Sequence, residues 1–85
     1  MKVEIEVPDY SSEFGLKAKW ESGFEIECKF QGDRVLIQAN REGLLSLANH
    51  LINLAQDTVP QGRHFHFDES NSLEDGSVEL IIEKR

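Results

Sequence analysis

The stretch from Asn40 to Asp57, NREGLLSLANHLINLAQD, constrains the fold of this chain more than any other. Its apolar residues recur at three- and four-residue steps, the spacing of one stripe along an α-helix. The stripe consists of Leu44, Leu45, Leu47, Ala48, Leu51, Ile52, Leu54 and Ala55. Asn40 is a favourable N-cap, and Pro60 and Gly62 close the segment. We predict a helix of about 25 Å with this stripe in the core.

Most of the remaining chain alternates apolar and polar residues with a period of two, which is typical of half-buried strands. We predict strands at 2–7, 14–20, 24–30, 35–39, 63–68 and 78–83. Short turns, most of them containing glycine, join the first four and indicate antiparallel hairpins. The order ββββαββ predicts an α+β fold of two layers, with the helix on one face of a mostly antiparallel sheet. At 85 residues, we expect a single domain, 1–85.

One helix can cover only one face of such a sheet, so the other face is expected to be open to solvent or to a partner. That face is predicted to be rich in acidic residues, and the polar loop 69–77 adds more. The candidate partner-binding residues on the face and the loop are Glu25, Glu27, Leu36, His64, His66, Asp68, Glu69, Glu74, Asp75, Glu79 and Ile81. Solvated antiparallel faces have a similar composition, so the pattern alone leaves both interpretations open.

The charge of the chain limits its partners. Nine Lys and Arg stand against sixteen Asp and Glu, a net charge of −7. An acidic field repels phosphate backbones, which argues against nucleic-acid binding, and it favours encounter with a basic protein. No segment is apolar enough to span a membrane, and the first residues have no signal-peptide core. With the single Cys28, these features predict a cytoplasmic protein.

The histidines suggest an alternative chemistry. His64 and His66 are expected on one face of a strand, and Asp68 continues the row. Two imidazoles and a carboxylate can hold zinc or another divalent metal, although an HxH pattern by itself is common. Exposed strand histidines that contact a partner explain the same pattern. His50 is expected in the helix, off the apolar stripe and far from the row.

The sequence contains no convincing catalytic set. Cys28 alternates with apolar residues and is expected to be an inert core thiol. There is no nucleophile elbow and no Gly-rich phosphate loop, and the segment 68–74 lacks the glycine of a calcium loop. We therefore predict neither an enzyme nor a cofactor. Gly43, early in the helix, is either a close-packing position or a tolerated defect.

Several short patterns together resemble a known family. They are NREGL at 40–44, the Leu-Ala pairs at 47–48 and 54–55, the row HxHxD at 64–68 and ELII at 79–82. This ordered set, within residues 35–84, resembles the Imm32 immunity-protein family of bacterial polymorphic toxin systems. The resemblance implies a small cytoplasmic protein that binds and neutralises a cognate toxin and is not an enzyme. Many such toxins are basic nucleases, which an acidic face would suit.

Three hypotheses follow from the residues and the resemblance. The first is an immunity protein that binds its toxin through the open acidic face and the adjacent loop. The second is a metal-binding protein or metal-dependent enzyme that uses His64 and His66. The third is a structural module that oligomerises through a strand edge or the open face. The strand order and the oligomeric state do not follow from the sequence.

Overall fold

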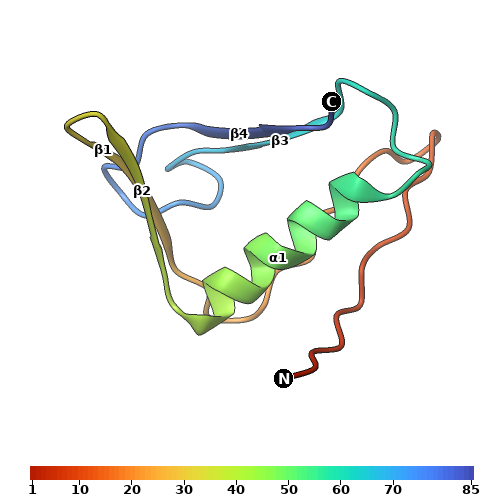
Figure 1. Ribbon diagram of the computed structural model, residues 1–85, viewed down its shortest axis with the longest axis horizontal. Helices are drawn as coiled ribbons and strands as arrows, with labels where there is room; N and C mark the ends of the chain where they lie inside the picture. Colours follow the sequence, from red (N-terminus) through yellow and green to blue (C-terminus); the bar gives the residue numbers. More distant parts are fainter.

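The computed structural model describes residues 1–85. Its elements are β1 (Ile26–Gln31), β2 (Arg34–Ala39), α1 (Arg41–Ala55), β3 (His64–Phe67) and β4 (Leu80–Glu83) (Figure 1). β1 pairs antiparallel with β2, and β3 pairs antiparallel with β4. The predicted α+β class, with one helix and antiparallel pairing, is confirmed. The helix is neither long nor apolar enough to cross a membrane.

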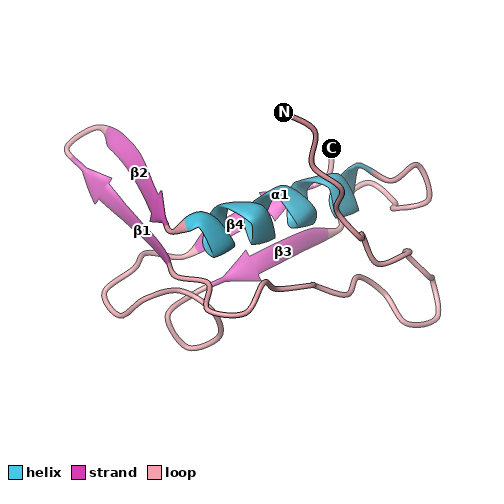
Figure 2. Cartoon of the chain, turned by 90° about the horizontal axis from the view of Figure 1, so that it is seen from below, coloured by secondary structure: helices cyan, strands magenta, loops and turns pink.

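The strands predicted at 2–7 and 14–20 are wrong, and so is the single sheet. The structure has two separate two-stranded sheets. The chain before β1 is loop throughout in Figure 2, apart from an isolated bridge between Ser11 and Gly15. The period-two alternation in this segment is therefore not accompanied by strand pairing.

The helix packs through a face that differs from the predicted one. Leu44, Leu51 and Ile52 were expected in the core, but they are 57%, 52% and 48% exposed. Leu54 alone of the leucines in the stripe is fully buried. The buried residues of α1 are Gly43, Ser46, Asn49, His50, Asn53 and Leu54. The helix thus turns a mainly polar face inward.

Three side chains of this buried face, together with the half-buried C-cap residue Gln56, hydrogen-bond to the backbone of the irregular segment 6–21. We call Ser46, Asn49, Asn53 and Gln56 the polar ridge. Its bonds, 2.8–3.0 Å long, join Ser46 Oγ to Glu21 N–H, Asn49 Nδ2 to Glu6 O, Asn53 Nδ2 to Lys17 O, and Gln56 Nε2 to Pro8 O. The ridge thus satisfies four backbone groups of the segment. These bonds account for the burial of polar side chains on α1.

The core lies between the buried face of α1, the inner face of β3–β4 and the start of β1. Its buried apolar residues are Ile26, Cys28, Leu54, Val59, Phe65, Phe67 and Leu73. The predicted core position of Cys28 is confirmed. The predicted position of His50 off the core is wrong, because its ring is fully buried and lies 4.3 Å from that of Trp20.

The junction of β2 and α1 is fixed by two residues. Asn40 caps the helix as predicted, because its Oδ1 accepts the Gly43 N–H at 2.8 Å. The same oxygen accepts the Glu25 N–H at 2.9 Å, and Asn40 Nδ2 donates to Gly23 O at 2.9 Å. At Gly43 a Cβ atom would lie 2.5 Å from Glu25 O and 2.9 Å from Ile26 Cγ1. Gly43 is therefore a close-packing position, one of the two alternatives that the sequence left open.

Candidate functional site

The two sides of the β3–β4 sheet differ in character. Phe65 and Phe67 of β3 are buried, whereas His64 and His66 between them are exposed. In the register of the sheet, His64 lies opposite Glu83 and His66 lies opposite Ile81. We call the exposed side the outer face. It comprises His64, His66, Ile81 and Glu83 of the strands, with Asp68 and Glu79 at their ends.

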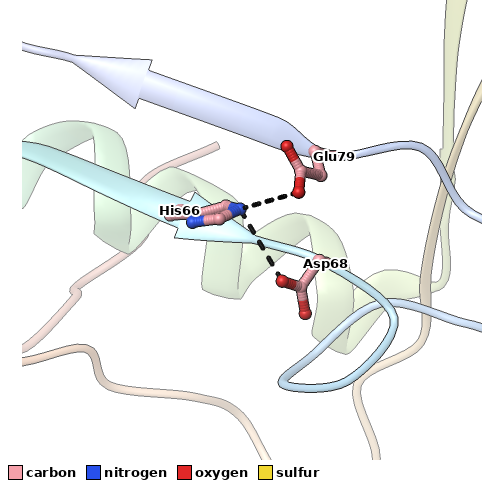
Figure 3. A group of neighbouring side chains, drawn as sticks. All are labelled: His66, Asp68 and Glu79. Carbon is pink, nitrogen blue, oxygen red and sulfur yellow. Dashed lines mark ion pairs between the residues drawn. The ribbon is translucent and has the colours of Figure 1, made fainter.

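Three residues of the outer face converge on one point (Figure 3). His66 Nε2 lies 3.6 Å from Asp68 Oδ2 and 3.6 Å from Glu79 Oε1. His64 is not part of this group, because its Nδ1 lies 3.2 Å from Gly62 O, within hydrogen-bond distance, and 3.9 Å from Glu83 Oε1. The structure therefore does not bring His64 and His66 together in one group, and the metal site suggested for this pair stays a prediction. Glu79 completes the group instead.

The carboxylate of Asp68 is held in a fixed orientation. Its Oδ1 accepts hydrogen bonds from the Ser70 hydroxyl at 2.7 Å, the Ser70 N–H at 2.9 Å and the Asn71 N–H at 3.1 Å. The Ser70 bonds, with a smaller contribution from the charge of His66, lower the pKa of Asp68. Because these bonds all engage Oδ1, Oδ2 is free to face the imidazole of His66.

The loop 69–77 is attached to the rest of the chain. Leu73 is buried in the core, and the N–H groups of residues 74 and 78 donate to β1 carbonyls at 2.9 and 2.8 Å. Glu69 Oε2 accepts the Gly76 N–H at 2.8 Å, so this candidate carboxylate closes the loop on itself. Glu74 and Asp75 are exposed.

The other candidate residues lie on the β1–β2 hairpin and not on the outer face. Glu27 and Leu36 belong to β1 and β2, and Glu25 precedes β1. Glu27 Oε1 lies 3.3 Å from Lys29 Nζ. The predicted single open face is thus divided between two sheets, because the expected continuous sheet does not form.

The structure adds an apolar surface that the sequence reasoning placed in the core. The exposed Leu44 and Leu51 lie on the side of α1 opposite the polar ridge, and Ile52 of the same helix is also exposed. Next to them is a groove of about 240 Å³ lined by Leu51, Leu54, Ala55, Ile82, Glu83 and Lys84. The signal for this orientation was present in the sequence, because the polar ridge has the spacing of one helix face.

Comparison with known proteins identifies the family. No curated protein and no solved structure matches the chain. The model of the family Imm32, described as immunity protein 32, matches residues 34–85. This segment is more than half of the 85 residues and includes β2, α1 and the whole outer face, whereas β1 and residues 1–25 lie before it. The chain therefore belongs to the Imm32 family of immunity proteins.

Proposed function

We propose that this chain is a cytoplasmic immunity protein that binds a basic toxin domain directly and neutralises it without catalysis. Membership of the Imm32 family supports an immunity role. The observation that carries the choice of surface is the exposed outer face of β3–β4, where acidic residues surround one apolar side chain. No catalytic step is needed for this function, because occupying the toxin surface is sufficient.

The composition of the outer face suits a basic partner. Asp68, Glu79 and Glu83 contribute three carboxylates, and the whole chain carries a net charge of −7. Complementary charge accelerates encounter and aligns the two proteins. Ile81, opposite His66 in the sheet, is 54% exposed among these charges. An apolar side chain within a polar rim is the usual arrangement of an energetic contact in an interface.

The neighbouring loop extends this surface. Its acidic residues Glu74 and Asp75 are exposed, while Leu73 and the Glu69 carboxylate hold the loop in place. A loop that is already ordered loses little conformational entropy when it binds. We therefore include the exposed acids of the loop in the proposed interface.

The test is the binding kinetics of a candidate toxin domain, the C-terminal domain of any large secreted protein encoded beside this gene, measured with matched charge variants. Glu79→Lys with Glu83→Lys reverses two charges on the outer face. Glu4→Lys with Glu13→Lys makes the same change at exposed residues outside the family segment. At low salt we expect the outer-face variant to associate about tenfold or more slowly than wild type, and the control to change far less.

Two results would contradict the proposed surface. Equal slowing by both variants would mean that only net charge matters. A large effect of Glu25→Lys with Glu27→Lys, together with none from the outer-face variant, would move the interface to the hairpin. Circular dichroism of each variant establishes that it is folded before its rates are compared.

A further inference from the structure

The outer face contains a group of side chains with the geometry of a metal site. We infer that His66, Asp68 and Glu79 bind a divalent transition ion, with zinc as the reference case. Their ligand atoms all lie within 4.8 Å of one another. In a tetrahedral zinc site, bonds of roughly 2.0–2.1 Å separate neighbouring ligand atoms by about 3.4 Å. The two distances of 3.6 Å from His66 Nε2 are close to this value.

The three side chains come from the paired strands β3 and β4 or from residues directly next to them. His66 lies in β3, Asp68 follows β3 directly, and Glu79 immediately precedes the paired strand β4. The hydrogen bonds to Asp68 Oδ1 leave Oδ2 free for the ion. Asn71 supports the same strand end, because its Nδ2 donates to His66 O and its Oδ1 accepts the Asp68 N–H, both at 3.0 Å. Such supporting bonds orient metal ligands and raise affinity.

Charge balance favours an ion over the imidazole alone. An imidazole binds a metal in its neutral form, so with two carboxylates the ligand set would carry a net charge of −2, which a dication neutralises. One nitrogen and two oxygen ligands suit zinc or a related transition ion better than magnesium or calcium, which prefer all-oxygen sites. The side chains of His66 and Glu79 are 43% and 68% exposed, so further positions are open to water or another donor.

The experiment is isothermal titration of the full chain, freed of metal by a chelator, with zinc chloride and with magnesium chloride as comparison. We expect one zinc per chain and much weaker magnesium binding. His66→Ala and Glu79→Gln should each weaken zinc binding about tenfold or more. His64→Ala is the matched control, because His64 lies two residues away on the same face and faces Glu83 instead. The zinc affinity of the His64→Ala variant should match that of wild type.

The same titration can overturn the site. The proposed site would be refuted if wild type did not bind zinc, or if both His66→Ala and Glu79→Gln bound zinc as tightly as wild type. A loss with His64→Ala as large as that with His66→Ala would place the ion elsewhere. Glu79 is mostly exposed, so Glu79→Gln remains a valid test if His66→Ala does not fold. The readout does not involve a toxin, so its outcome is independent of the proposed immunity function.

Discussion

His50 is a buried polar residue in apolar and aromatic surroundings. Both ring nitrogens are buried and have no hydrogen-bond partner. The imidazole packs against the rings of Trp20, Phe65 and Phe67, with centroids 4.3, 5.1 and 5.3 Å away. Burial lowers its pKa to about 4 from the ordinary 6.5. His50 therefore acts as a neutral aromatic side chain that resists protonation.

This environment predicts acid sensitivity. In the unfolded chain His50 takes up a proton below about pH 6.5, its ordinary pKa. In the folded chain it is protonated only below about pH 4. Stability from this residue is therefore complete above pH 6.5 and falls as the pH drops toward 4, by up to about 3 kcal/mol. Urea denaturation from pH 7 to pH 4 measures this loss. His50→Leu should lose less stability over the same range; parallel curves would refute the assignment.

Gly43 makes a second prediction at the residue scale. Alanine favours helices over glycine by about 1 kcal/mol, but here its Cβ would press on Glu25 O and the side chain of Ile26. We expect Gly43→Ala to destabilise the fold by about 1–3 kcal/mol, measured by urea denaturation. A gain in stability would show that the helix does not approach β1 this closely.

At the scale of elements, the sequence specified that α1 exists but not which way it faces. The predicted segment from Asn40 to Asp57 contains the observed helix, Arg41–Ala55, and its cap. Apolar periodicity favoured the face containing Leu44 and Leu51. That rule assumes that helices bury only apolar residues, and the polar ridge violates it because its side chains bind the backbone of an irregular segment.

Two leucines of α1 test its orientation. Leu54 is 5% exposed and Leu51 is 52% exposed. Leu54→Ala should therefore cost about 2–5 kcal/mol as a cavity in the core, and Leu51→Ala below about 1 kcal/mol. Thermal or urea unfolding of the two variants provides the comparison. The reverse order of losses would mean that the apolar stripe, and not the polar ridge, faces the core.

For the whole molecule, the local sequence pattern predicted the α+β fold class but not how the strands pair into sheets. Alternation located the four strands, and in β1 and β3 it also identified the buried face, since Ile26 and Cys28, or Phe65 and Phe67, lie on one side. It could not show that the strands form two sheets, because pairing depends on contacts between distant segments. Alternation within one strand also predicted His66 and Asp68 on one face. It could not predict that Glu79 lies next to His66, because that depends on how β4 pairs with β3.

At the scale of the whole molecule, membership of the Imm32 family and the acidic outer face support the proposal that this surface binds a toxin. The most direct measurement is growth of cells that express this chain together with a candidate toxin domain, the C-terminal domain of a large secreted protein encoded beside this gene. We expect wild type and the control Glu4→Lys, Glu13→Lys to restore growth, and Glu79→Lys, Glu83→Lys to restore it less at equal protein levels. No rescue by wild type, although it is folded and expressed, would contradict the immunity function proposed for this pair.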